Sequence, residues 1–257
     1  MKTGSTRLGA VALLIALTCC GTEDFFAQGG RLRVLASAGV RAAVDDLHSR
    51  LEREAGSPFD VEFSTTSAIK QRIEAGEGFD VAILTSDAID ELTQKGKILT
   101  GSRARLGRSG IGVGVRKQAP RPDVSTPEAI RNALLRAKSL TWVQPGASRV
   151  HIDAMLEALG IADEVRSKVL LTQGVEQSIA SVAEGKSEIV ISLISEILPA
   201  QGVELVGPIP RQFQYYVELD AGVGARSQKS QAAGALVRAL ASPAAAQTYR
   251  AKGMDPP

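Results

Sequence analysis

A strand–helix–strand unit between residues 59 and 84 most constrains what this chain can fold into. Residues 59–63 alternate apolar and polar side chains as in a short strand, and residues 81–84 form an apolar run that predicts a buried strand. Between these segments, Ile69 and Ile73 lie four residues apart on one helical face, and Gly76 ends the predicted helix. Alternation of strands and helices favours a parallel sheet with helices on both faces.

The same alternation continues along the chain. The other predicted strands are residues 32–36, 140–143 and 189–191. Four further helices are predicted at residues 40–54, 88–94, 152–159 and 175–182. Another predicted helix begins with a capping box at Ser125–Glu128, and a terminal helix begins at Ser242-Pro243. Sheets of this class place ligands at the carboxyl ends of their strands, beside the N-termini of helices.

Two segments predict a division into lobes. Residues 109–116 are a Gly/Val strand that crosses into a second lobe, and residues 214–219 with 222–225 return the chain to the first. The predicted fold class is therefore α/β with two lobes, each a mainly parallel sheet covered by helices, joined by two crossing strands. The predicted boundaries are 1–28 for a signal peptide and linker, 29–110 for the first lobe, 111–215 for the second lobe, and 216–257 for the return segment.

Four consecutive hydroxyl residues, Ser64 to Ser67, stand where the helix of the first unit begins. The first turn of a helix carries free backbone N–H groups and a partial positive charge, so hydroxyls placed there describe a site for a small anion. The alternative is that Thr66 or Ser67 only caps the helix.

The N-terminus predicts export. Lys2 and Arg7 precede a short apolar run, residues 10–17, which is too short to span a membrane. Cys19 and Cys20 follow, in a setting that loosely matches a lipoprotein cleavage site with lipid added to Cys20. The predicted location is the periplasm, either as a lipoprotein or as a soluble form cut near this point.

The composition excludes several classes of function. A cut before Cys20 leaves at most one cysteine, which excludes an intramolecular disulfide and a thiolate metal site, and we expect no metal and no cofactor. Without Lys2 and Arg7, 28 basic residues balance 28 acidic ones, so there is no electrostatic case for binding nucleic acid. Aromatic residues make up 4% of the chain, which argues against sugar or quaternary-amine ligands.

Three segments carry a resemblance to a known family. They read FSTTSAIKQRIEAGEGFDVAILTSDAIDEL (63–92), LTWVQPGASRVHIDAMLEALG (140–160) and GVEQSIASVAEGKSEIVIS (174–192). On these segments the chain resembles the type II periplasmic binding proteins, and within them the molybdate-binding receptors of ABC importers. The resemblance implies two lobes that close on an oxyanion held by hydroxyls and backbone N–H groups, and a monomer that delivers its ligand to an ABC permease in the inner membrane.

The resemblance also implies site residues in the first lobe. The first family hydroxyl falls at Gly39, with Ser37 nearby, and the second falls within Thr65, Thr66 and Ser67. Gly39 has no hydroxyl, so its contribution is a backbone N–H that a ligand can approach closely.

In the second lobe, Ser148 and Val175 match positions where the backbone meets the ligand, and Ser192 stands where the family has a tyrosine. The loss of that tyrosine weakens the molybdate assignment, because a buried oxyanion needs its oxygens saturated with donors. The space it leaves suits a larger ligand such as an organic carboxylate. Arg149, at a helix start, is the candidate partner for a carboxylate, with a surface arginine as the alternative.

Two other classes of function stay open. The first is a receptor that presents a bound solute to a signalling partner, which the sequence does not distinguish from transport. The second is an exported hydrolase, which the sequence disfavours because it has no G-x-S-x-G and no H-E-x-x-H motif. The sequence therefore predicts a binding protein and not an enzyme.

Overall fold

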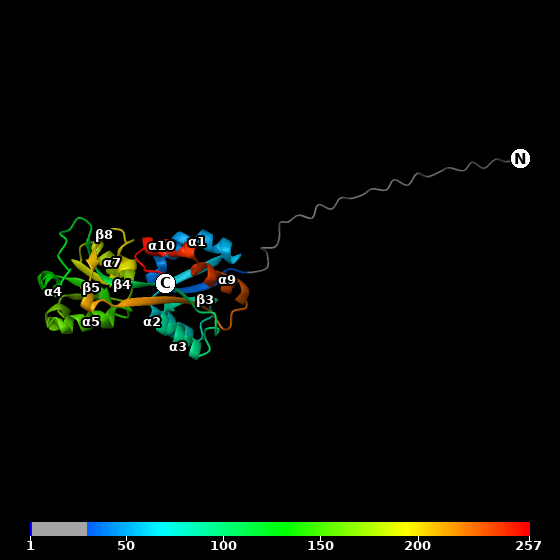
Figure 1. The fold of residues 1–257 in the computed structure, drawn as a ribbon, viewed down its shortest axis with the longest axis horizontal. Coiled ribbons are helices and arrows are strands. Elements are labelled where there is room, and N and C mark those ends of the chain that lie inside the picture. Colours follow the sequence, from blue (N-terminus) through cyan, green and yellow to red (C-terminus); the bar gives the residue numbers. More distant parts are fainter. Residues whose placement is uncertain (2–29) are drawn as a thin grey trace.

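The computed structural model describes Met1 and residues 30–257, which form two α/β halves side by side (Figure 1). The strands are β1 (Leu32–Ser37), β2 (Phe59–Ser64), β3 (Val81–Thr85), β4 (Ala104–Arg116), β5 (Leu140–Val143), β6 (Val169–Thr172), β7 (Ile189–Leu193), β8 (Val203–Pro208) and β9 (Tyr216–Val223). The helices are α1 (Arg41–Ala55), α2 (Thr66–Glu74), α3 (Ser86–Gln94), α4 (Pro127–Arg136), α5 (Arg149–Ala158), α6 (Ala162–Arg166), α7 (Val175–Ala183), α8 (Ile194–Ile197), α9 (Ser230–Leu240) and α10 (Pro243–Ala251), with 3-10 turns η1 (Ala38–Val40) and η2 (Arg211–Phe213). The predicted signal peptide and Cys20 lie outside the described residues.

The strands follow the spatial order β2-β1-β3-β9-β4-β7-β5-β6, and β8 also pairs with β4. Within each half the strands that carry a helix at their carboxyl end are parallel: β1 pairs in parallel with β2 and β3, and β5 pairs in parallel with β6 and β7. Strands β9 and β4 run antiparallel to their neighbours between these two groups. The fold class is thus the predicted one, α/β with two mainly parallel halves.

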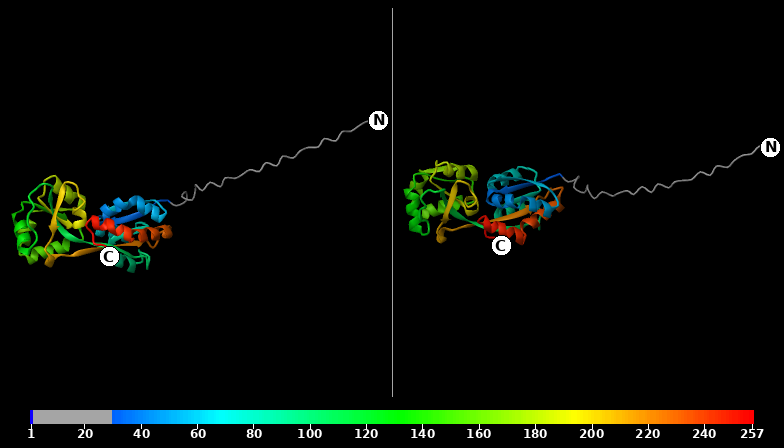
Figure 2. Two further views of the ribbon diagram at one scale, coloured as in Figure 1. Left: turned by 45° about the horizontal axis from the view of Figure 1, so that its top comes forward. Right: turned by 90° about the horizontal axis from the view of Figure 1, so that it is seen from above.

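Strand β4 belongs to both halves. Its residues from Ala104 to Gly110 pair with β9, and its residues from Ile111 onward pair with β7 and β8. Figures 1 and 2 show β4 and β9 passing between the halves. We propose that the lobes are 29–110 with 216–257, and 111–215, because the pairing of β4 changes sheets between Gly110 and Ile111.

Helices cover both faces of the sheet in the first lobe. On one face, α1 packs against α9 and α10, and α9 contacts β9. On the other face, α2 and α3 enclose a separate apolar cluster that includes Leu35, Ile69 and Leu84, each 0% exposed. Apolar burial on both faces explains why β3 is a continuous apolar run and does not alternate.

Most of the predicted elements are present. Strand β5 occupies the predicted residues, and β1, β2, β3, β7, α1 and α3 match their predictions to within a few residues. Four short elements (α6, β6, α8 and β8) and the alanine-rich helix α9 were not predicted. No helix in residues 30–257 combines the length and the apolar character needed to cross a bilayer.

Three local predictions were wrong. The two return segments form one strand, β9, because residues 220–222 pair without interruption with β3. The N-cap of α4 is Thr126, whose Oγ1 accepts a bond from the Ala129 N–H at 3.1 Å, so the capping box between Ser125 and Glu128 is not formed. The N-cap of α2 is Thr65 rather than Thr66 or Ser67.

Gly224, directly after β9, tests the packing of the return strand. A Cβ on Gly224 would lie 2.5 Å from the backbone oxygen of Phe79, which cannot move without disturbing β3. We expect Gly224→Ala to lower the free energy of unfolding by about 1–3 kcal/mol in a urea titration. The control is Gly78→Ala, where a Cβ meets nothing within 4 Å. Equal stability of the two variants would contradict this packing.

Candidate functional site

A small cavity of about 20 Å³ lies between the two lobes, at the carboxyl ends of their parallel strands. Its thirteen lining residues are Ser37, Ala38, Ser64, Thr65, Thr66, Val143, Gly146, Ala147, Ser148, Val175, Ser192, Leu193 and Glu196. They come from the ends of β1, β2, β5 and β7, from the turns and helices that follow these strands, and from the start of α7, which follows β6. This is the position at which sheets of this class bind ligands.

The first lobe contributes hydroxyl groups at two helix starts. Thr65 caps α2, because its Oγ1 accepts a bond from the Ala68 N–H at 3.3 Å. Ser37 similarly accepts from the Gly39 N–H at 3.4 Å at the start of η1. For Ser37, capping and ligand binding are compatible, since the accepting hydroxyl still has its own proton to donate to an anion. The Thr65 hydroxyl donates to the Ser67 Oγ at 3.3 Å, because Ser67 donates its proton to Pro145, so the Thr65 proton becomes available when the contact between Ser67 and Pro145 opens.

The second lobe contributes Ser148 and the first residue of α7, Val175. Ser148 is the N-cap of α5 by position, but its side chain makes no capping bond, so its hydroxyl is available to a ligand. Ser148 is 7% exposed and lines the cavity. Helix α7 directs its N-terminus at the cavity through Val175, and a helix N-terminus favours negative charge.

Glu196 is a lining residue that the sequence analysis missed. Its Oε2 accepts bonds from the Ser192 hydroxyl and, at 3.3 Å, from the Leu193 N–H. The surrounding protein withholds water from this half-buried carboxyl, and this burial, partly opposed by the two hydrogen bonds, raises the pKa of Glu196 to about 7. The available signal was a single charged residue inside the apolar stretch of residues 189–198.

Two polar contacts join the lobes beside the cavity. The Ser67 hydroxyl donates to the Pro145 carbonyl oxygen at 3.0 Å, and Arg41 of α1 forms an ion pair with Glu176 of α7. The lobes are therefore closed against each other, and the cavity that remains has about the volume that one water molecule needs. A larger ligand enters only when these contacts open.

The predicted site residues thus fall into two groups. Ser37, Thr65, Thr66, Ser148, Val175 and Ser192 line one cavity. Gly39, Ser67 and Arg149 lie beside it without lining it: a Cβ on Gly39 would face Leu219 and Leu193, at 3.1 and 3.2 Å. Arg149 donates to Asp153 at 2.7 Å and lies 5.9 Å from the Trp142 ring. Whether these nine residues contact a ligand stays a prediction.

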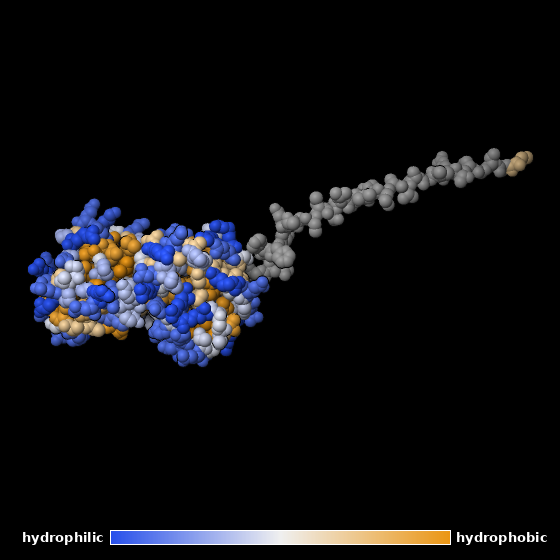
Figure 3. Space-filling view, in the orientation of Figure 1, coloured by the Kyte–Doolittle hydropathy of each residue, from blue (hydrophilic) through white to orange (hydrophobic). Residues whose placement is uncertain are grey.

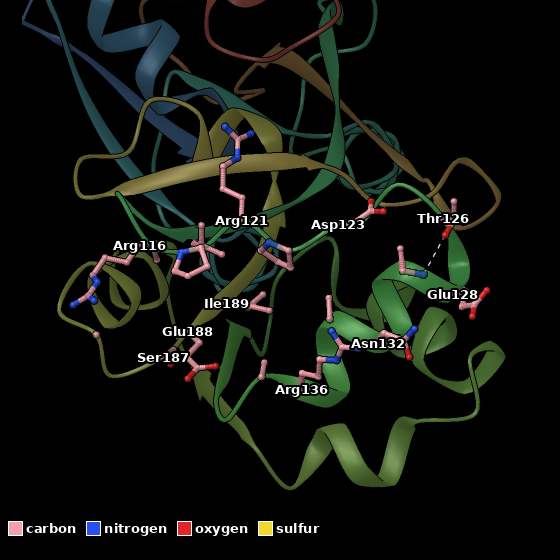
Figure 4. Close-up of a pocket in the computed structure, with 18 residues that line it drawn as sticks. Arg116, Arg121, Asp123, Thr126, Glu128, Asn132, Arg136, Ser187, Glu188 and Ile189 are labelled. Carbon is pink, nitrogen blue, oxygen red and sulfur yellow. Dashed lines mark hydrogen bonds between the residues drawn. The ribbon is translucent and has the colours of Figure 1, made fainter.

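A larger hollow of about 850 Å³ lies on the second lobe alone, between β4, the loop that follows it and α4. Figure 4 shows its arginines, Arg116, Arg121 and Arg136, on different sides of the hollow and not gathered at one point. Arg121 is already paired with Glu204 at 2.7 Å. Because every lining residue belongs to one lobe, closure of the lobes cannot enclose a ligand here, and the small cavity is the better candidate site.

The face of the molecule seen in Figure 3 is mainly hydrophilic, with apolar patches on both lobes, and it narrows between them. Within residues 30–257 no group of three or more His, Cys, Asp and Glu side chains is arranged to hold a metal ion.

The cavity between the lobes offers hydroxyls, helix N-termini and one carboxyl, a set of groups suited to an anion that carries acidic protons or carboxylates.

Comparison with known proteins agrees with this arrangement. The family model described as "Bacterial extracellular solute-binding protein" matches residues 32–255. The chain belongs to this family. Membership places this solute-binding protein outside the cytoplasm and implies a small ligand, and the named structural neighbours are binding proteins.

One curated relative is an aconitate isomerase of a Pseudomonas species, 30% identical over 233 residues that cover 88% of this chain and 87% of the relative. Among solved structures, the periplasmic molybdate-binding protein of Azotobacter vinelandii has a TM-score of 0.74 at 15% identity, covering 88% of this chain and all of the other. The sulfate-binding protein SubI of Mycobacterium tuberculosis has a TM-score of 0.69 at 16% identity, covering 89% of this chain and 87% of the other. The resemblance to the molybdate receptors is thus confirmed at the level of the fold.

The raised pKa of Glu196 predicts a pH dependence of stability. The unfolded chain loses this proton near the usual pKa of 4.5, whereas the folded protein keeps it until about pH 7. Stability therefore falls as the pH rises between these values, by up to about 3 kcal/mol. We expect the melting temperature of the unliganded protein to fall from pH 5 to pH 8 relative to that of Glu196→Gln. Parallel curves for the two proteins would show that the carboxyl is not desolvated.

Proposed function

We propose that this protein is an exported receptor that closes its two lobes on a small anion and delivers it to an ABC importer in the inner membrane. The observation that carries the proposal is the closed cavity between the lobes, with hydroxyls and helix N-termini from both of them. An anion bound between the lobes would bridge them through hydrogen bonds from both sides, in place of the direct contact between Ser67 and Pro145 that must open to admit it. Binding would thus stabilise the closed state, which is the form that a transporter recognises.

The ligand that we propose is a small organic polycarboxylate. Glu196 places a carboxyl in the cavity, and when ionised it repels a dianion such as molybdate that has no proton to share. When Glu196 is protonated, its carboxyl donates a hydrogen bond to a ligand carboxylate, so the two groups share the one proton that Glu196 holds. The name of the Pseudomonas relative makes aconitate the first polycarboxylate to test.

The predicted roles of Arg149 and Cys20 and the predicted monomer are also part of this proposal. Arg149 adjoins Ser148 and is the nearest cation in sequence to the lining residues, so it would bind a ligand carboxylate after leaving Asp153. If it does, Arg149→Ala abolishes carboxylate binding without unfolding the protein, and unchanged affinity removes Arg149 from the site. The protein would act as a periplasmic monomer, with a lipid on Cys20 if palmitate labels the mature chain.

A second candidate function is an isomerase that acts on aconitate. Two observations favour it: the 30% identity to a protein with that name, and a carboxyl inside the cavity whose pKa of about 7 suits it to take up and release a proton at neutral pH. The receptor and the isomerase would use the same ligand site. A receptor releases its ligand unchanged, whereas an isomerase releases it with its double bond moved.

A thermal-shift panel of molybdate, sulfate, phosphate, citrate and trans-aconitate tests the ligand class. A ligand at one hundred times its dissociation constant stabilises the folded state by about 2.7 kcal/mol. We expect this shift with a polycarboxylate and not with molybdate. A shift with molybdate alone would contradict the assignment to carboxylates while leaving the anion receptor intact.

The free hydroxyl of Ser148 tests the location of the site. We expect Ser148→Ala to raise the dissociation constant of the stabilising anion about tenfold in isothermal titration calorimetry, since a hydrogen bond to a charged group contributes about 1.5–3 kcal/mol. The matched control is Ser187→Ala, a buried serine of the same lobe that lies outside the cavity. Equal affinity of the two variants would place the ligand elsewhere.

A further inference from the structure

We propose that Glu196 removes a proton from a saturated carbon of a bound unsaturated polycarboxylate and returns it two carbons away, which moves the double bond. This inference rests on the proposed binding of a polycarboxylate in the cavity between the lobes. It assigns to Glu196 the chemical step that an isomerase carries out and a receptor does not.

Position makes Glu196 the candidate. It is the only titratable side chain among the thirteen lining residues. Both of its hydrogen bonds, from the Ser192 hydroxyl and the Leu193 N–H, fall on Oε2. Among the described residues Oε1 accepts no hydrogen bond and is not sealed from solvent, so one carboxylate oxygen is held in place and the other is free for the ligand.

The rest of the cavity supplies what a proton shift needs. Removing a proton next to a carbon–carbon double bond spreads negative charge onto the ligand carboxylate as a dienolate. The hydroxyls of Ser37, Thr65 and Ser148 and the N-terminus of α7 are donors placed around the cavity to stabilise that charge. Closure of the lobes excludes water, which strengthens these interactions.

The step balances without a co-reactant. The C–H bond of the ligand's CH₂ group breaks, its electron pair forms the new double bond, and the proton passes to Glu196. The electrons of the old double bond then take the proton back at the other end of the three-carbon unit. In aconitate, this shift regenerates the same connectivity and can interchange the cis and trans isomers, so no oxidant, reductant or metal is required.

The charges around Glu196 set its pH dependence. Burial raises its pKa most, the bonds from Ser192 and Leu193 lower it, and the Glu176 carboxylate on α7 raises it further. Glu176 is itself paired with Arg41 across the lobes. Because the base must be ionised, the rate of isomerisation is expected to rise from pH 6 to pH 8, with its midpoint near 7.

The test is an incubation of the full chain with trans-aconitate in D₂O, followed by proton NMR for cis-aconitate and for loss of carbon-bound hydrogen. Glu196→Gln keeps the shape of the side chain and an oxygen to accept the two bonds, but it cannot take up a proton. The control is Glu184→Gln, an exposed carboxylate of the same lobe that pairs with Lys186 outside the cavity. Binding of aconitate to each protein is measured separately by thermal shift.

The proposal expects conversion by the native protein and by the control, and a loss of at least about 100-fold in Glu196→Gln with aconitate binding retained. Binding without conversion by the native protein overturns the proton transfer and leaves the receptor function standing. No binding of aconitate by the native protein overturns both. If Glu196→Gln does not fold, the test uses the rate of isomerisation by Glu196→Asp and the pH profile of that rate for the native protein. A native rate that is flat from pH 6 to pH 8 overturns the proposal.

Discussion

The structure depends on the pairing of β4 with two different sheets. Its first half pairs with β9 and its second half with β7 and β8, so the backbone ladder itself joins the two lobes. The parallel strands on either side then end facing the same gap. Side chains separated by more than 100 residues, such as Ser37 and Ser148, meet there because each follows the carboxyl end of such a strand. The position of the proposed anion site is a consequence of this topology.

The chemistry of the site follows from what burial does to Glu196. In open water this carboxyl would be ionised and would repel an anion. In the folded protein, burial raises its pKa to about 7, which suits it to share or transfer a proton. The same residue thus weakens the case for a permanently charged oxyanion and strengthens the case for a carboxylate. A fold shared with molybdate and sulfate receptors does not by itself decide between them.

Much of this fold could be predicted from local patterns, and the site only in part. Long apolar runs and glycine stops predicted β3, β5 and α2, because burial on both faces leaves a strong signal. Strand β6 was missed because it is not a buried run, since Leu170 and Leu171 are exposed, and α8 was missed because its four residues make only about one helical turn. Six of the nine predicted site residues line the cavity. Thr65 and Thr66 belong to a hydroxyl cluster at a helix start that is visible in the sequence, whereas Ser37, Ser148, Val175 and Ser192 were implied by the family resemblance. Glu196 was missed because its proximity to Ser37 and Ser148 depends on the crossing of the lobes, which no local pattern records.

A crystal structure of the protein grown with the polycarboxylate that stabilises it most would test the central claim most directly. The account predicts electron density for the ligand between the lobes, within hydrogen-bond distance of the Ser37, Thr65 and Ser148 hydroxyls and of the Glu196 carboxyl. Density confined to the hollow of the second lobe near Arg136, with an empty space between the lobes, would contradict it.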